Sequence, residues 1–243
     1  MTILLTGAAG FIGMHVAEAL LARGERVIGI DSLTPYYDLH LKHARRDRLL
    51  AHAQFSFAAM NIADRTEITE FFNRHRDVTR IIHLAAQPGV RHSLVDPYSY
   101  VEANVMGHLV MLEAARALPR LDHFLYASSS SVYGGNKDLP YREDDRVDQP
   151  VSLYAATKRA DELISEAYGH IFGLPQTGLR FFTVYGPWGR PDMAPWLFAD
   201  AILSGRPITL YEGGRLKRDF TFVEDIVAGV LGALDHPPGA GKP

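Results

Sequence analysis

The sequence contains no cysteine, which excludes disulfide bonds, thiolate metal sites and cysteine nucleophiles. It also lacks any apolar run close to the about 20 residues that span a bilayer. Neither sign of charge dominates, because 28 acidic and 25 basic residues leave a formal net charge of only −3. A chain with this balance has no general affinity for nucleic acid or anionic membranes. We therefore expect a globular cytoplasmic protein without a nucleic-acid or membrane partner.

Short β-rich runs alternate with amphipathic stretches along the chain. The continuous apolar run Thr2–Thr6 is typical of a buried parallel strand, and a helix is predicted over 10–23. Two longer helices are predicted over 94–118 and 153–172, where apolar residues recur every three or four positions. Further strands are predicted over 26–30, 54–58, 80–84, 123–127 and 177–181. This alternation predicts an α/β fold with a doubly wound parallel sheet of the Rossmann type.

Three glycines, Gly7, Gly10 and Gly13, lie in the segment TGAAGFIG between the first predicted strand and the first predicted helix. A dinucleotide phosphate needs close approach to the backbone and the positive end of a helix dipole, and glycine permits both. Turns are rich in glycine in general, so it is the strand–turn–helix context that indicates phosphate binding. The spacing is GxxGxxG rather than GxGxxG, which indicates a subset of such folds.

Asp31 ends the second predicted strand, 18 residues after Gly13. A carboxylate at this place accepts hydrogen bonds from ribose hydroxyls and repels a 2′-phosphate, so it predicts NAD rather than NADP. The alternative is a helix N-cap or turn aspartate. The basic run at 42–48 could indicate phosphate or nucleic-acid binding, but it stands alone in a net acidic chain. We interpret that run as a solvated helix face.

Tyr154 and Lys158 are four residues apart on a predicted helix and project from the same face. A tyrosine has an ordinary pKa of about 10, and a nearby ammonium and an oxidised nicotinamide would favour its phenolate. Four serines at 128–131 follow the fifth predicted strand, at the edge where ligands bind in open α/β sheets. Both patterns also arise by chance, as an ordinary helix surface and a polar turn. They indicate a catalytic site only because a dinucleotide-binding half precedes them in the sequence.

Together these motifs resemble the extended short-chain dehydrogenase/reductase family, which includes NAD-dependent nucleotide-sugar epimerases and dehydratases. The resemblance covers essentially the whole chain. Its remaining parts, in order, are HLAAQ at 83–87, Asn104, YAATK at 154–158 and RFFTVYGP at 180–187. Within the family the sequence is most similar to UDP-glucuronate 4-epimerases, through YYDLHLKHARRDRL, SSSSVYG, PVSLYAATK, GLRFFTVYGPWGRPDMA and KRDFT.

The resemblance implies a role for each matching residue. Tyr154 would be the catalytic base, Lys158 its electrostatic partner and Ser129 the third member of the triad. NAD would be held by Gly7, Gly10, Phe11, Ile12, Gly13, Asp31, Asn61, Ile62, Ala85, Ala86, Asn104 and Lys158. Ser130, Ser131, Thr183 and Arg190 would face the sugar, and Arg218 the diphosphate. No metal site is expected.

The implied reaction inverts carbon 4 of a UDP-sugar through a 4-keto intermediate, and the expected substrate is UDP-glucuronate. Dehydratases and decarboxylating UDP-xylose synthases typically carry an acid after the triad hydroxyl, where this chain has Ser130 and Ser131. A UDP-glucose 4-epimerase is an alternative, although such relatives usually carry Asn where this chain has Thr183. A protein that only senses NAD or scaffolds a partner is the non-enzymatic alternative.

We expect an NAD-binding domain at 1–180 and a partial substrate-binding region at 181–243 that is interleaved with it. The second region contains a predicted strand and helix over 220–234, then a terminal loop that reads as cut short. Relatives of this family generally continue past this point, so we expect the region to be truncated. The resemblance also implies a homodimer in which the two long helices form a four-helix interface. Alternatively, the apolar faces of these helices cover the sheet, and both interpretations can hold for different faces of the helices.

Overall fold

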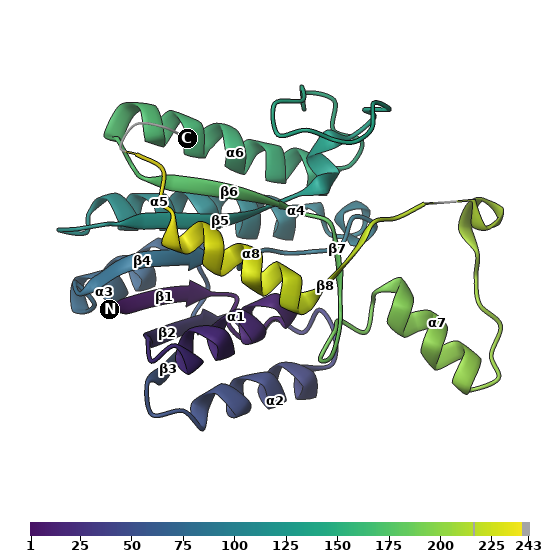
Figure 1. The fold of residues 1–243 in the computed structure, drawn as a ribbon, viewed down its shortest axis with the longest axis horizontal. Helices are drawn as coiled ribbons and strands as arrows, with labels where there is room; N and C mark the ends of the chain where they lie inside the picture. The colour runs from purple at the N-terminus through teal and green to yellow at the C-terminus, as the bar shows by residue number, and fades with distance from the viewer. Residues whose placement is uncertain (216, 240–243) are drawn as a thin grey trace.

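The computed structural model describes residues 1–215 and 217–239, so Leu216 and the end of the predicted terminal loop, residues 240–243, lie outside the described residues. A central sheet contains six parallel strands in the order β3-β2-β1-β4-β5-β6 (Figure 1). The strands are β1 (Thr2–Thr6), β2 (Arg26–Asp31), β3 (Phe55–Ala59), β4 (Val78–His83), β5 (His123–Ser129) and β6 (Gln176–Phe181). The strand order reverses between β1 and β4, which confirms the predicted doubly wound sheet.

Helices cover both faces of the sheet. One layer contains α1 (Phe11–Ala22), α2 (Leu39–Leu50) and α8 (Val223–Asp235), and the other contains α3 (Arg65–Arg74), α5 (Gly107–Arg116) and α6 (Leu153–Phe172). Neighbouring strand residues point to opposite layers, so Leu4 packs in the second and Leu5 in the first. Because both faces are buried, β1 is apolar throughout rather than alternating.

The predicted continuous helix over 94–118 is wrong. The segment begins with a 3-10 turn (His92–Leu94), continues through α4 (Pro97–Tyr100) and a π-helix (Val101–Met106), and only then becomes α5. Asp96 caps α4 by accepting from the Ser99 amide, and Pro97 occupies its first turn, so a new helix begins there. Leu94 and Tyr98, which the apolar periodicity placed on a sheet-covering face, are 80% and 83% exposed.

The predicted helix over 153–172 is confirmed as α6, but the expectation that its apolar stripe covers the sheet is wrong. Leu163 and Ile171 belong to that stripe and are 51% and 65% exposed. The face of α6 that is buried is largely polar, and it consists of Ala155, Thr157, Lys158, Asp161, Glu162 and Ser165. These polar side chains can be buried because they form ion pairs and hydrogen bonds with one another and with the sheet.

The basic run at 42–48 is not a fully solvated face, because Lys42 and Arg45 of α2 are buried. Arg45 has no exposed surface, and its guanidinium donates to the carbonyls of Ala9 and Gly189, both at 3.3 Å, and to that of Trp188. It therefore ties the β1–α1 turn to a segment more than 140 residues further along the chain.

After β6 the chain forms a small second sheet, in which β7 (Thr183–Tyr185) pairs in parallel with β8 (Phe220–Phe222). Between them α7 (Ala194–Leu203) stands apart from the main sheet (Figure 1). The following α8 returns to pack on α1, where Val230 and Leu234 join the core cluster of β1 and α1. The proposed division at 180/181 stays a prediction. Within the described ranges, no helix has the length and apolar character needed to cross a membrane.

Candidate active site

The β1–α1 turn has the geometry of a phosphate cradle. Gly7 has a φ of +74°, and a side chain there would lie 2.9 Å from the amide nitrogen of Ala85. A Cβ on Gly13 would lie 2.0 Å from the Gly7 carbonyl oxygen, so the turn and the helix touch backbone to backbone. Gly10 occupies the N-cap of α1, and no side chain caps the helix there. The amides of the first turn are therefore available to an anionic ligand.

Asp31 is buried at the end of β2, and its carboxylate faces this turn. Its Oδ2 accepts from the Ala9 amide at 3.1 Å and its Oδ1 from the Leu33 amide at 2.9 Å. Each carboxylate oxygen has a second lone pair, so ribose hydroxyls can still donate to it. The arrangement fits the adenosine ribose of a dinucleotide at the carboxyl end of the sheet.

Phe11 and Ile12 open α1, and the other residues predicted to hold NAD lie just beyond β3 and β4 or on the π-helix. Asn61 is exposed and accepts from the Ala63 amide at 3.0 Å, whereas Ile62 is buried. The Ala85 amide donates to Thr6 Oγ1 at 3.1 Å, which holds the segment after β4 against β1. All of these residues therefore lie near the carboxyl edge, and their contacts with NAD stay predictions.

Asn104 is buried, and its amide group already has partners in the protein. Its Oδ1 accepts from the Gln87 amide at 2.7 Å, and its Nδ2 donates to the Thr157 hydroxyl at 3.0 Å. It thereby joins the segment after β4 to α6. These bonds give Asn104 a role in shaping the cleft that does not require contact with a cofactor.

The four serines do not form one bank of hydroxyls. Ser128 Oγ donates to Glu162 at 2.6 Å, beneath α6. Ser129 is the last residue of β5, and its side chain points the other way, because successive strand residues alternate in direction. Ser129 Oγ accepts from the Ser131 amide at 3.2 Å and caps the 3-10 turn Ser130–Tyr133. Ser129, Ser130 and Ser131 therefore remain candidates for the site at the carboxyl end of β5, which we call the strand-end site.

Tyr154 and Lys158 lie on the first two turns of α6, which begins after Ser152. The Ser152 hydroxyl caps the helix by accepting from the Ala155 amide at 3.1 Å. Lys158 Nζ donates to the Ala127 carbonyl of β5 and to Asp161 Oδ2, both at 3.0 Å. Since Ala127 is two residues before Ser129, Lys158 is fixed directly beneath the end of β5.

Tyr100 contributes to this site although the sequence did not indicate it. Its ring meets that of Tyr154 edge to face, with 6.2 Å between ring centroids. Its hydroxyl lies 2.6 Å from the Pro88 carbonyl and 2.5 Å from that of Gly89, so it is anchored to the loop after β4. Burial raises the pKa of Tyr100, which keeps the phenol neutral.

Arg190 does not present a free guanidinium to the site. Its Nε donates to Asp192 Oδ1 at 3.0 Å, its guanidinium lies 5.7 Å from the Tyr36 ring centroid, and the Tyr36 hydroxyl donates to Asp192 at 3.1 Å. Burial acts to lower the pKa of Arg190, but the hydrogen bond and charge of Asp192, together with the interactions with Tyr36 and Tyr154, outweigh it and raise the pKa. The charge of Arg190 interacts with Tyr154, so this trio borders the site. Tyr36 and Asp192 were not predicted as site residues, although they lie in the family motifs YYDLHLKHARRDRL and GLRFFTVYGPWGRPDMA. Those motifs could have indicated them.

The two remaining predicted substrate residues lie on the small second sheet. Thr183 begins β7 and pairs with Phe220 of β8. Arg218 is exposed on the segment before β8, and its Nη1 donates to the Lys217 carbonyl at 2.8 Å. The roles of Thr183 toward a sugar and of Arg218 toward a diphosphate stay predictions.

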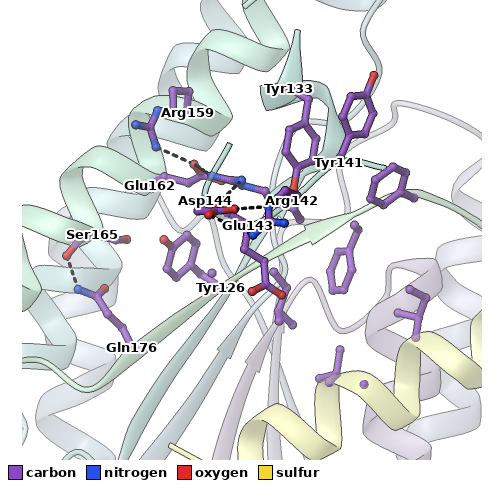
Figure 2. Close-up of a pocket in the computed structure, with 18 of the residues that line it drawn as sticks. Tyr126, Tyr133, Tyr141, Arg142, Glu143, Asp144, Arg159, Glu162, Ser165 and Gln176 are labelled. Carbon is purple, nitrogen blue, oxygen red and sulfur yellow. Dashed lines mark hydrogen bonds and ion pairs between the residues drawn. The ribbon is translucent and has the colours of Figure 1, made fainter. Parts of the chain in front are cut away.

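A cavity of about 940 Å³ lies elsewhere, along the free edge of β6 between α6 and α8 (Figure 2). Its walls include Tyr133, Glu162 and Arg180 on one side and Ile226 and Val230 of α8 on the other. Neither Tyr154 nor the glycine turn borders it, so it is distinct from the strand-end site. Among the residues that the structure describes, no group of three or more His, Asp or Glu side chains is placed to hold a metal ion.

Comparison with known proteins agrees with this geometry. Residues 3–243 match the NAD dependent epimerase/dehydratase family. A probable UDP-glucuronate 4-epimerase of Rhizobium meliloti (strain 1021) is 48% identical over 242 residues, which cover 98% of this chain and 69% of the relative. The crystal structure of UDP-glucuronic acid 4-epimerase from Bacillus cereus, with UDP-glucuronic acid and NAD, is similar with a TM-score of 0.92. It is 37% identical, and the match covers 99% of this chain and 75% of that one.

A structure of another specificity is also similar. UDP-glucose 4-epimerase from Thermotoga maritima, crystallised with UDP-glucose, superposes with a TM-score of 0.87 and 29% identity. The match covers 100% of this chain and 78% of that one. The fold is thus similar to those of enzymes that are named for different UDP-sugars.

Proposed function

The chain belongs to the NAD dependent epimerase/dehydratase family, and on this premise we propose that it is a UDP-sugar 4-epimerase whose substrate is UDP-glucuronate. The observation that supports this most is the coincidence of Ser129, Tyr154 and Lys158 at one end of the sheet with the similarity to UDP-glucuronate 4-epimerases. A protein that only binds NAD would not need all three side chains.

NAD fits the first half of the sheet. The glycine turn and the open N-terminus of α1 would hold its diphosphate, and Asp31 its adenosine ribose. When bound, NAD supplies a hydride acceptor for carbon 4 of the sugar and later a hydride donor. Two N–H groups of the Lys158 ammonium donate to Ala127 and Asp161, and the third would hold the nicotinamide ribose.

Tyr154 would carry the proton chemistry. Its phenolate would take the proton of the sugar 4-hydroxyl. After the 4-keto sugar has rotated in the site, Tyr154 would return a proton to the same oxygen. The ammonium of Lys158 favours this phenolate, because an opposite charge nearby stabilises the ionised form. The Ser129 hydroxyl would donate to the sugar oxygen, which restrains it while the proton moves.

UDP-glucuronate imposes a further requirement. Oxidation at carbon 4 creates a β-keto acid, and such an acid loses carbon dioxide when the breaking bond to its carboxylate aligns with the carbonyl π system. Ser130, Ser131 and Thr183 would hold the carboxylate out of that alignment by donating hydroxyl hydrogen bonds. Arg190 would add a charge that its pairing with Asp192 partly neutralises.

Product analysis tests the proposal. Protein loaded with NAD is incubated with UDP-glucuronate and, separately, with UDP-glucose, and the nucleotide sugars are separated by anion-exchange chromatography. We expect UDP-galacturonate without UDP-pentose, and much slower conversion of UDP-glucose. Faster conversion of UDP-glucose would instead establish the second candidate, a UDP-glucose 4-epimerase, which the similarity to the Thermotoga enzyme supports.

We also propose that the protein is a homodimer. The exposed apolar residues of α6 and of the 92–101 segment give the molecule uncovered apolar surface on adjoining elements. They are Leu94, Val95, Tyr98, Val101, Leu163 and Ile171. Burying this surface against a second copy would remove it from water. Light scattering during size-exclusion chromatography tests the proposal, and replacing Leu163 and Ile171 by Glu should yield monomers.

A further inference from the structure

A buried ion pair lies beneath the strand-end site, between two residues one helical turn apart on α6. Lys158 Nζ is 3.0 Å from Asp161 Oδ2, and the two side chains are only 5% and 1% exposed. The other carboxylate oxygen, Asp161 Oδ1, is buried without a hydrogen-bond partner. Such a carboxylate is costly to bury unless a charge compensates it, so its ionised form depends on Lys158.

The ion pair also limits what Lys158 can do. An ammonium has three N–H donors, and here one donates to Asp161 and one to the Ala127 carbonyl. One donor therefore remains for a ligand at the end of β5. The position of the ammonium is determined from two sides, by the sheet and by α6.

We propose that Asp161 is a positioning residue for the reaction, which fixes the Lys158 ammonium and weakens the positive field that Lys158 exerts on Tyr154. The inference rests on the proposed function, in which Lys158 holds the nicotinamide ribose and supports the Tyr154 phenolate. Asp161 touches neither the sugar nor the cofactor in this account. It acts through Lys158 alone.

Lys158 and Asp161 follow Tyr154 by about one and two turns of α6. The charge of Arg190 also interacts with Tyr154, and Arg190 is paired with Asp192.

His83 of β4 and His108 of α5 are buried, and burial lowers the pKa of His83 to about 3 and that of His108 well below its usual value. Burial raises the pKa of Tyr126 of β5 to about 12. These three groups are therefore neutral near pH 7.

Glu162 is the other buried carboxylate of α6, and two arginines neutralise its charge. Its carboxylate pairs with Arg180 of β6 at 2.9 Å and with Arg159 at 2.8 Å. Burial raises the pKa of Asp161 to about 6, against the opposing effect of Lys158. Asp161 is therefore ionised above about pH 6, and its charge offsets that of Lys158 in the neutral range.

The test compares three variants of the full chain loaded with NAD. Asp161→Asn removes the charge and keeps an oxygen acceptor, and Asp161→Ala removes both. Glu166→Gln is the matched control, because it removes one carboxylate from an exposed position of the same helix. Two quantities are measured: the pH midpoint at which the Tyr154 phenolate forms, from ultraviolet difference absorbance against the Tyr154→Phe form of each variant, and the Kd for NAD from calorimetry.

In Asp161→Asn we expect the phenolate to form about one pH unit lower, because the field of Lys158 is no longer offset. NAD affinity should stay within about threefold of the original, since the amide oxygen still accepts from Lys158. In Asp161→Ala the ammonium loses that anchor, and NAD affinity should fall about tenfold. Glu166→Gln should match the unmodified protein in both measurements.

An unchanged or higher phenolate midpoint in Asp161→Asn would overturn the inference. The near-isosteric Asn variant keeps the test decisive even if Asp161→Ala does not fold. The phenolate titration needs no substrate, so it is independent of the proposed function. A shifted midpoint in a protein that converts no UDP-sugar would refute the proposed function alone, and an unshifted midpoint in an active epimerase would refute the inference alone.

Discussion

The two buried histidines predict how the protein responds to acid. His83 Nδ1 lies 2.7 Å from the Thr6 hydroxyl, and His108 Nε2 lies 2.7 Å from the Ser165 hydroxyl. Their rings are stacked obliquely with 5.4 Å between centroids, so two imidazolium ions cannot be accommodated side by side. Burial lowers the pKa of both groups, that of His83 to about 3.

Proton linkage gives the sign of the change in folding stability with pH. In the unfolded chain the pKa of His83 returns to 6.5, so below that pH the unfolded state binds a proton that the folded state refuses. The neutral His83 ring makes its full contribution to the free energy of unfolding above about pH 6.5. This contribution is lost progressively as the pH falls toward about 3. Between about pH 7.5 and about pH 5.5 the loss from His83 alone is about 1.4 kcal/mol. His108 adds a loss of the same sign.

Urea unfolding at a series of pH values measures this loss. The perturbation is His83→Gln, which removes the titrating ring and should make the decline between about pH 7.5 and about pH 5.5 shallower by about 1.4 kcal/mol. Asp161, whose raised pKa acts in the opposite sense, is present in both proteins and cancels from the difference. His52→Gln removes an exposed ring as the matched control. Equal slopes in His83→Gln and the unmodified protein would refute the reasoning.

Three other changes test the site itself. Tyr154→Phe should lower turnover by about 10² to 10⁴-fold and leave NAD affinity unchanged, and a loss below about tenfold would mean that Tyr154 is not the base. Gly13→Ala should abolish NAD binding in calorimetry, because its Cβ would lie 2.0 Å from the Gly7 carbonyl oxygen, and ordinary NAD affinity would contradict the tight turn. Thr183→Val should slow turnover of UDP-glucuronate and release some UDP-pentose, detectable by chromatography, whereas an unchanged product profile would show that this hydroxyl does not restrain the carboxylate.

Features that depend on local pattern were predictable from the sequence. The first strand was predictable because burial on both faces makes the centre of β1 continuously apolar, and the glycine turn because its conformation admits no side chain. The break in the helix over 94–118 also had a local signal, since Asp96 followed by Pro97 is typical of a helix start. The periodicity of the apolar residues concealed it.

Features that depend on distant partners were not predictable. Arg45 is buried because carbonyls at 188 and 189 surround its guanidinium, and nothing in the basic run itself indicates those acceptors. The spacing of Lys158 and Asp161 is visible in the sequence, but their burial is set by the packing of α6 on the sheet. Tyr100 meets Tyr154 only because α4 and α6 lie side by side.

The return of α8 onto α1 bears on how the chain folds as it is synthesised. Leu20 and Met14 of α1 belong to the same core cluster as Val230 and Leu234, and Arg23 at the end of α1 pairs with Asp235 at 2.9 Å. Until residue 235 has left the ribosome, the part of α1 that faces α8 has no cover, although the sheet and α2 can already pack on its other sides and the glycine turn was made first. The nascent chain therefore exposes this apolar surface until α8 has been synthesised, which is the condition under which chaperones engage a protein.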